Sequence, residues 1–99
     1  MKSNFNAIIN SHTPVLIDFY AHWCGPCKTL APILKDVKKE LEGTIKIIKI
    51  DVDKNQALAT KYQVRGVPTM MLFKNGKQLW RQSGVLQKGE IIAIINQHS

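Results

Sequence analysis

Two apolar runs with an amphipathic segment between them most constrain the fold of this chain. Residues 15 to 20 are apolar except at one position, and residues 44 to 52 are rich in isoleucine. Nearly continuous apolar runs are typical of central strands buried on both faces. Apolar residues recur every three or four positions over residues 24 to 41, which predicts a helix with one apolar stripe. Two parallel strands joined by a helix form a right-handed βαβ unit.

The rest of the chain extends this unit into a mixed sheet. Residues 69 to 74 and 78 to 83 predict two further strands, and Asn75-Gly76 between them is a strong hairpin signal. Further helices are expected near the start, after the second apolar run and at the end, over residues 3 to 10, 53 to 62 and 87 to 97. We therefore predict an α/β fold in which helices flank both faces of a four-stranded mixed sheet, as one domain over residues 1 to 99.

The composition bounds the class of protein. With 44% hydrophobic and 21% charged residues, the chain resembles an ordinary globular protein. No stretch approaches the roughly 20 apolar residues of a membrane span. The first ten residues have neither an apolar core nor a cleavage site of small residues, so they do not resemble a signal peptide. We expect a cytoplasmic protein without a membrane partner.

The net charge of +7 is the one unusual total. Such a charge can attract an acidic protein, a nucleic acid or an anionic membrane, or it can simply keep the surface soluble. The 14 basic residues are scattered from Lys2 to Lys88, whereas a protein that follows a phosphate backbone usually concentrates them. We favour the solubilising interpretation and expect no nucleic-acid partner.

The only two cysteines, Cys24 and Cys27, stand where the first strand gives way to the long helix. The thiolate is the reactive form of cysteine, and a helix N-terminus favours it through unpaired N–H groups and the helix dipole. Cys24 follows Trp23 at that terminus, where it can meet a partner. Cys27 lies one turn further in, positioned to attack a mixed disulfide at Cys24. We interpret the pair as a redox-active dithiol, with the Cys24–Cys27 disulfide as its oxidised form and no separate cofactor.

Other interpretations of the cysteine pair are weaker. A bridge that closes so short a loop adds little stability, so a structural staple is disfavoured. A structural zinc site needs four ligands, and the only histidines show no paired spacing: His12, His22 and His98. We expect no metal, and inert buried cysteines remain the other alternative. Gly25 and Pro26 suit the turn, because glycine bends tightly and proline fits a first helical turn.

At this point the sequence resembles the thioredoxin family over roughly residues 4 to 97. Residues 23 to 28 (Trp-Cys-Gly-Pro-Cys-Lys) match its active-site motif, and residues 65 to 69 (Arg-Gly-Val-Pro-Thr) resemble the segment that holds its cis-proline. Asp18 stands where thioredoxins carry a buried carboxylate, and Gly84 where a glycine lines their substrate groove. The resemblance implies the thioredoxin fold. The N-terminal segment is too short for the usual first edge strand, which we expect to be absent or short.

The resemblance implies a general protein-disulfide reductase. Cys24 would attack the disulfide of a protein substrate, and Cys27 would resolve the mixed disulfide. A flavoprotein of the thioredoxin reductase type would restore the dithiol, and the chain would act as a monomer. Two alternatives stay open: a thiol oxidant or isomerase of an oxidising compartment, and a non-catalytic binding module that uses the surface around Trp23 and Pro68.

Asp18 in an apolar strand needs an explanation, because a bare buried charge is costly. Its pKa should be raised, or it should have a partner. The resemblance favours a proton acceptor for Cys27, directly or through water. The compatible alternative is a structural carboxylate paired with Lys49 on the neighbouring strand.

Other positions are assigned by the resemblance alone. A docking surface for an extended substrate is implied beside the dithiol, with a cis-proline that exposes backbone groups, formed by Trp23, Val67, Pro68 and Gly84. His22 departs from the family pattern, in which this position is often acidic. A protonated His22 would stabilise the Cys24 thiolate, or the side chain is solvated with little influence. The positive charge also departs from the acidic family norm and leaves the choice of partners open.

Overall fold

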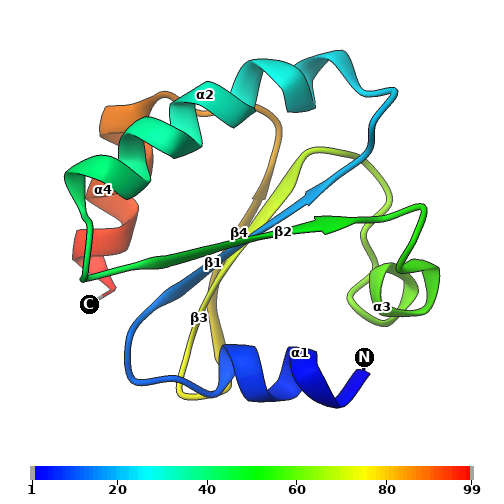
Figure 1. Ribbon diagram of the computed structural model, residues 1–99, viewed down its shortest axis with the longest axis horizontal. Coiled ribbons are helices and arrows are strands. Elements are labelled where there is room, and N and C mark those ends of the chain that lie inside the picture. The colour runs from blue at the N-terminus through cyan, green and yellow to red at the C-terminus, as the bar shows by residue number, and fades with distance from the viewer. Residues whose placement is uncertain (1, 99) are drawn as a thin grey trace.

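The computed structural model describes residues 2–98 and contains four helices and four strands within them. Figure 1 shows the helices on both sides of a central sheet. Each predicted element is present, with bounds that differ by a few residues. In chain order the elements are α1 (Lys2–Ile9), β1 (Val15–Tyr20), α2 (Gly25–Glu40), β2 (Lys46–Asp51), α3 (Gln56–Lys61), β3 (Thr69–Lys74), β4 (Lys77–Ser83) and α4 (Lys88–Gln97).

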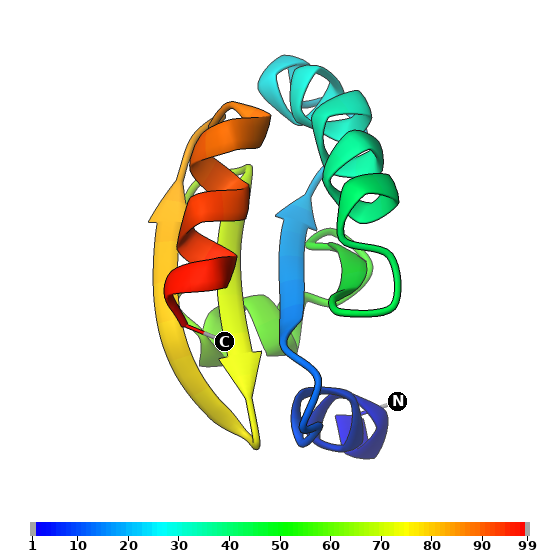
Figure 2. The ribbon, with the colours of Figure 1, turned by 90° about the vertical axis from the view of Figure 1, so that its left-hand side faces the viewer.

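The sheet is mixed, with the strand order β2-β1-β3-β4. β1 and β2 are parallel, and their register places Val15 opposite Lys46 and Tyr20 opposite Asp51. β3 runs antiparallel to both β1 and β4, as the opposed arrows in Figure 2 show. The predicted βαβ unit and four-stranded mixed sheet are confirmed. Within residues 2–98 no strand precedes β1, which follows directly after α1.

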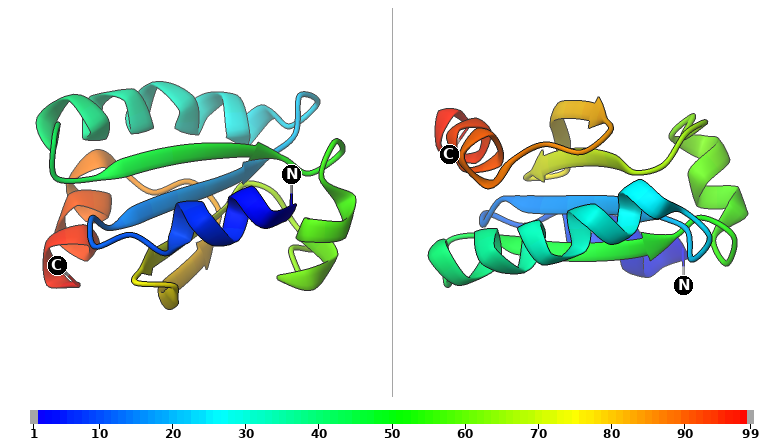
Figure 3. Two further views of the ribbon diagram at one scale, coloured as in Figure 1. Left: turned by 60° about the horizontal axis from the view of Figure 1, so that its bottom comes forward. Right: turned by 90° about the horizontal axis from the view of Figure 1, so that it is seen from above.

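Alternation along the strands divides the core into two layers. One layer lies under α2 and α4 and contains Leu16, Met70 and Leu72 from the sheet. The other lies under α1 and contains Ile17 and Met71, each one residue further along its strand. Successive side chains of a strand point to opposite faces, so these neighbours separate into different layers. Figure 3 shows α2 on one side of the sheet and α1 with α3 on the other.

The apolar stripe of α2 fixes how that helix faces the sheet. Leu30, Leu34 and Val37 are buried at three- and four-residue spacing, which places them on one side of the helix. Cys27 lies three residues before Leu30 and continues the stripe, so it is buried too. Packing of the stripe thereby turns Cys27 toward the interior, where it packs with Cys24 and Ala21.

The turn between β3 and β4 has the backbone that its sequence favours. Asn75 and Gly76 both have positive φ values, 53° and 80°, as a two-residue type I′ hairpin requires. The Asn75 N–H donates to Ser11 O at 2.8 Å, and the Gly76 N–H donates to Ile9 O at 3.0 Å. The predicted hairpin is confirmed, and these two bonds attach it to the end of α1.

Two predicted bounds are too long because side chains stabilise turns at those positions. Thr44 was expected to begin the second strand, but its N–H and hydroxyl both donate to Leu41 O, at 2.9 and 2.7 Å. The helix expected from residue 53 begins at Gln56, because the Asp51 carboxylate accepts the Asp53 N–H at 2.8 Å and holds a turn there. Short polar side chains compete with regular structure in this way.

Candidate active site

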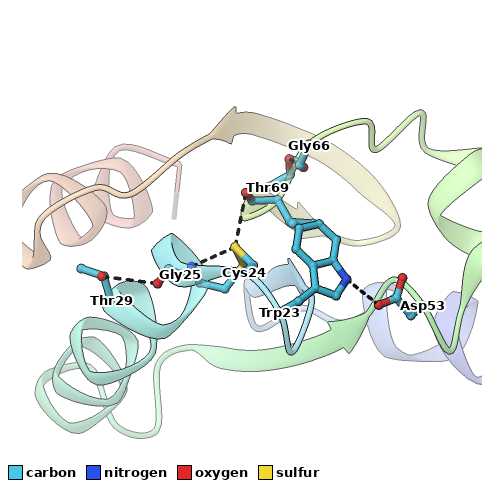
Figure 4. The surroundings of a disulfide bond; sticks show 9 residues. Trp23, Cys24, Gly25, Thr29, Asp53, Gly66 and Thr69 are labelled. Carbon is cyan, nitrogen blue, oxygen red and sulfur yellow. Dashed lines mark hydrogen bonds between the residues drawn. A yellow bond between two sulfur atoms is a disulfide. The ribbon is translucent and has the colours of Figure 1, made fainter.

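Cys24 and Cys27 are joined by a disulfide at the start of α2, with their Cα atoms 5.3 Å apart. Cys24 is the N-cap residue, with an extended backbone, and its Sγ accepts a hydrogen bond from the Cys27 N–H at 3.1 Å. Figure 4 shows this region. Both cysteines are buried. A sulfur at an N-cap occupies the position where capping oxygens normally satisfy the free N–H groups of a helix, so the site is built to stabilise negative charge on Cys24.

The segment before β3 lies directly beside Cys24. The Cys24 Sγ is 3.5 Å from the Val67 carbonyl oxygen, and the Val67–Pro68 peptide bond is cis, which confirms the predicted cis-proline. The Gly84 N–H donates to Pro68 O at 2.9 Å, so the structure also brings Gly84 to this place. Val67 is half-buried and Pro68 is buried. Pro68 therefore contributes to the position of the backbone and little to exposed area.

Thr69 holds this segment in place, a role that the sequence-based predictions did not assign to it. Its hydroxyl lies 2.6 Å from Gly66 O and 2.9 Å from the Ser83 hydroxyl. These contacts tie the turn before Pro68 to the end of β4. A buried threonine at the start of an otherwise apolar strand is the signal that points to such a role.

Trp23 is the one large apolar side chain in the described part of the chain that is mostly exposed, at 70%. Its ring is nevertheless held in place, because the indole Nε1–H donates to Asp53 Oδ2 at 2.9 Å (Figure 4). Asp51 Oδ1 holds the turn that carries Asp53 by accepting the Asp53 N–H and, at 3.4 Å, the Lys54 N–H. Sequence reasoning missed Asp51 and Asp53. Two aspartates at the end of β2 could have indicated this role. Because β1 and β2 are parallel, they end at the same edge of the sheet, and β1 leads there to the cysteine pair.

His22 contacts Asp51 rather than the dithiol. Its Nε2 lies 3.2 Å from Asp51 Oδ2, and its side chain is 72% exposed. The centroids of the His22 and Tyr20 rings are 5.6 Å apart, with the rings nearly perpendicular. A protonated His22 thus faces a carboxylate, which offsets its positive charge as seen from Cys24. The sequence-based alternatives for His22 did not include this partner.

Asp18 is 1% exposed, and neither carboxylate oxygen has a hydrogen-bond partner within residues 2–98. Burial raises the pKa of Asp18 from 3.8 to about 6, and the positive charge of Lys49 lowers it in part. Alternation along β1 places Asp18 on the same face of the sheet as Leu16, under α2. Cys27 is buried with Ala21 and Cys24, and the role of Asp18 toward Cys27 stays a prediction.

The predicted ion pair between Asp18 and Lys49 is wrong. The two residues are neighbours in the register of β1 and β2, but the Lys49 ammonium lies 4.7 Å from the centre of the Tyr20 ring. Lys49 is exposed. Because an ammonium loses hydration when it is buried, the long side chain keeps its charge at the surface over an aromatic ring.

Two further kinds of feature concern the whole described region. Within residues 2–98, no three His, Cys, Asp or Glu side chains are grouped so that they could hold a metal ion. No helix in this region combines the length and the apolar character needed to cross a bilayer. Cys24 and Cys27, the two cysteines in this region, are joined in the disulfide described above.

The fold and the site together define a class of protein. A Cys-X-X-Cys disulfide caps a helix that follows a parallel strand, with a buried carboxylate on that strand. A dithiol in this position exchanges electrons with other thiols and disulfides. The site is that of a thiol–disulfide oxidoreductase.

Comparison with known proteins identifies the family. A family model described as Thioredoxin matches residues 1–97. The chain is 45% identical over 93 residues to the thioredoxin of Haemophilus influenzae, covering 94% of this chain and 87% of that protein. It is 44% identical over 97 residues to the thioredoxin of Rickettsia conorii, covering 97% and 92%. The structure of a mutant thioredoxin from Halobacterium salinarum is similar, with a TM-score of 0.87 at 38% identity over 96% of this chain and 82% of that one. The chain belongs to the thioredoxin family, whose members are protein-disulfide reductases.

The raised pKa of Asp18 predicts how the stability of the fold depends on pH. Because the folded pKa, about 6, exceeds the ordinary value of 3.8, the protonated form of Asp18 is compatible with folding and the ionised form is costly. Protonated Asp18 makes its full contribution to the free energy of unfolding below about pH 4. This contribution is lost as the pH rises through 6. A difference of about two pKa units corresponds to ~3 kcal/mol.

We expect the substitution Asp18→Asn to remove this loss. We would measure the free energy of unfolding with urea on the oxidised protein. The difference between the variant and the wild type should increase, in favour of the variant, by roughly 3 kcal/mol from about pH 4 to pH 8. Asp36→Asn is the matched control, because Asp36 is exposed on α2. Parallel pH profiles for the wild type and Asp18→Asn would contradict the assignment.

Proposed function

We propose that Cys24 is the attacking thiol and Cys27 the resolving thiol of a reductase for protein disulfides. The Cys24 thiolate attacks one sulfur of the substrate, and the other substrate sulfur leaves as a thiolate. Cys27 then attacks the Cys24 sulfur, which re-forms the Cys24–Cys27 bond and releases the second substrate thiolate. Two electrons pass from the protein to the substrate. The observation that carries this assignment is the N-cap position of Cys24, whose Sγ accepts the Cys27 N–H at 3.1 Å.

The substrate is proposed to dock along the segment before β3. An extended chain beside Val67 would bring its disulfide toward Cys24, because the Val67 carbonyl oxygen is 3.5 Å from the Cys24 Sγ. Trp23, held by Asp53, supplies exposed apolar area at one side. Exposed backbone groups of a partner can pair with such a segment as an added strand would. The proposed docking surface consists of Trp23, Gly25, Pro26, Val67, Pro68 and Gly84.

Asp18 is proposed to accept the proton of Cys27 in the resolving step. Both Asp18 oxygens are buried without a partner, so they are available to a proton donor in the layer under α2. With its pKa raised to about 6, the carboxylate is mostly ionised near neutral pH and is a stronger base than an ordinary aspartate. A water molecule can complete the path if the two groups are not in direct contact.

The electrons are proposed to come from a flavoprotein of the thioredoxin reductase type, and the chain is proposed to work as a cytoplasmic monomer. The similarity to bacterial thioredoxins along almost the whole chain supports this assignment. The cytosol keeps thiols reduced, which suits a protein that donates electrons to disulfides. A thiol oxidant would need an oxidising compartment instead.

The roles of the two cysteines predict different outcomes for their serine variants. Cys24→Ser and Cys27→Ser should both reduce insulin at the uncatalysed background rate, because each lacks half of the dithiol. Cys27→Ser alone should accumulate a mixed disulfide with insulin at Cys24, detectable as an adduct by mass spectrometry under non-reducing conditions. An adduct on Cys24→Ser of equal abundance, or full activity of either variant, would contradict the roles.

The proton-transfer role predicts a specific kinetic defect. In single turnovers, Asp18→Asn should form the mixed disulfide at the wild-type rate but resolve it roughly a hundredfold more slowly at pH 7, the low end of the effect of a general base. In the wild type the resolving rate should rise with pH through about 6, and the variant should lack this rise. Equal resolving rates across this pH range would show that Asp18 acts only on stability.

The direction of electron flow can be tested by the redox potential and by recycling. The known potential of thioredoxin is about −270 mV, and that of a strong thiol oxidant about −120 mV. We expect a value near the first, together with reduction of the disulfide by NADPH and a bacterial thioredoxin reductase. A value near −120 mV would assign the protein to the oxidants.

A further inference from the structure

Of the seven acidic side chains in the sequence, Asp53 is the one that is exposed near the dithiol. Asp18 and Asp51 are buried, and Asp53 is hydrogen-bonded to Trp23. The other four lie on the second half of α2, the turn after it and the first turn of α4: Asp36, Glu40, Glu42 and Glu90. A helix rises 1.5 Å per residue, so the acidic end of α2 begins about 18 Å from Cys24.

These acidic groups belong to the end of the molecule away from the dithiol. The Lys88 ammonium lies 3.1 Å from Glu40 Oε1, which joins the start of α4 to the end of α2. Figure 1 shows the same arrangement, with the start of α4 beside the later part of α2 and the first turn of α2 at the opposite side of the picture. Here positive and negative charges offset one another.

Three exposed cations lie one or two residues along the chain from residues that form or hold the docking surface. Lys28 lies one turn after Cys24, and its N–H donates to Cys24 O at 3.3 Å. Lys54 directly follows the aspartate that holds Trp23, and Arg65 lies two residues before Val67. Within residues 2–98, the side chains of these three residues make neither an ion pair nor a hydrogen bond, so their charges face solvent.

Tertiary structure therefore groups basic residues that are scattered in the sequence. Positions 28, 54 and 65 are far apart along the chain, but they belong to the start of α2, the turn after β2 and the segment before β3. These elements meet where β1 and β2 end and β3 begins. The carboxylates of this edge are Asp51, which is buried beside His22, and Asp53, which is exposed and stays charged because its Trp23 donor is neutral. Three exposed cations therefore outnumber one exposed carboxylate here.

We infer that the docking surface selects disulfide proteins that carry acidic side chains next to the reactive cystine. Complementary charge raises the rate of encounter and suppresses partners of like charge. With three cations at the surface, an acidic substrate should react about tenfold faster than a basic one at low ionic strength. This inference rests on the proposed attack by Cys24 at this surface. It replaces the solubilising interpretation of the net charge for these three residues.

The test uses three synthetic disulfide-bonded peptides that differ only in the residues flanking the cystine, which are glutamate, glutamine or lysine. Their reduction is followed by stopped flow with the reduced wild type and with the variant Lys28→Gln/Lys54→Gln/Arg65→Gln. The matched control is Lys46→Gln/Lys74→Gln/Lys77→Gln, which removes three positive charges from strand ends at the opposite edge of the sheet. Each peptide reacts with both variants, so its intrinsic reactivity cancels in the comparison.

We expect the wild type and the control variant to prefer the glutamate peptide about tenfold, and the Lys28→Gln/Lys54→Gln/Arg65→Gln variant to lose most of that preference. The rate on the glutamine peptide is the reference for each protein, so that any change in the reactivity of Cys24 cancels in the ratio of rates. The preference should also disappear near 1 M salt, where charges are screened within about 3 Å. Equal losses in both variants would assign the effect to net charge and overturn the inference, as would a wild type without preference. Failure to reduce even the glutamine peptide would instead contradict the proposed function.

Discussion

Packing of the α2 stripe against the central strands is the interaction on which the site depends. Leu30, Leu34 and Val37 are buried against side chains of β1 and β3, and burial of such side chains contributes roughly 1.5–3 kcal/mol each. This contact sets the position and the rotation of the helix. It thereby places Cys24 at an N-terminus beside Val67 and buries Cys27 with Cys24 and Ala21. The chemistry of the dithiol is a consequence of where a helix begins.

Burial of Asp18 destabilises the folded state, and the rest of the fold compensates for this. An ionised carboxylate with no hydrogen-bond partner within residues 2–98 opposes folding, and the apolar core on both faces of β1 compensates for it. Strained or destabilising groups often mark functional sites. The same burial that destabilises the ionised form raises the pKa of Asp18 toward the range in which a base works near neutral pH.

Much of the fold and part of the site could be predicted from the chain. The apolar runs, the stripe of α2 and Asn75-Gly76 are local patterns, so they indicated the βαβ unit and the hairpin directly. The cis bond before Pro68 and the site around it followed from family resemblance rather than from physical pattern. The Asp18–Lys49 ion pair was wrong because register makes two residues neighbours without fixing where a long side chain places its charge.

The sequence by itself determined the dithiol, the helix it caps and the order of strands and helices, because each depends on residues close together in the chain. Only the tertiary structure decided what surrounds the dithiol. Asp51, Asp53 and Thr69 gained their roles through contacts between loops that meet at one edge of the sheet. The cations near Cys24 are grouped for the same reason. Charge and hydrogen bonding act through space, so side chains distant in sequence become one site only when the sheet brings their loops together.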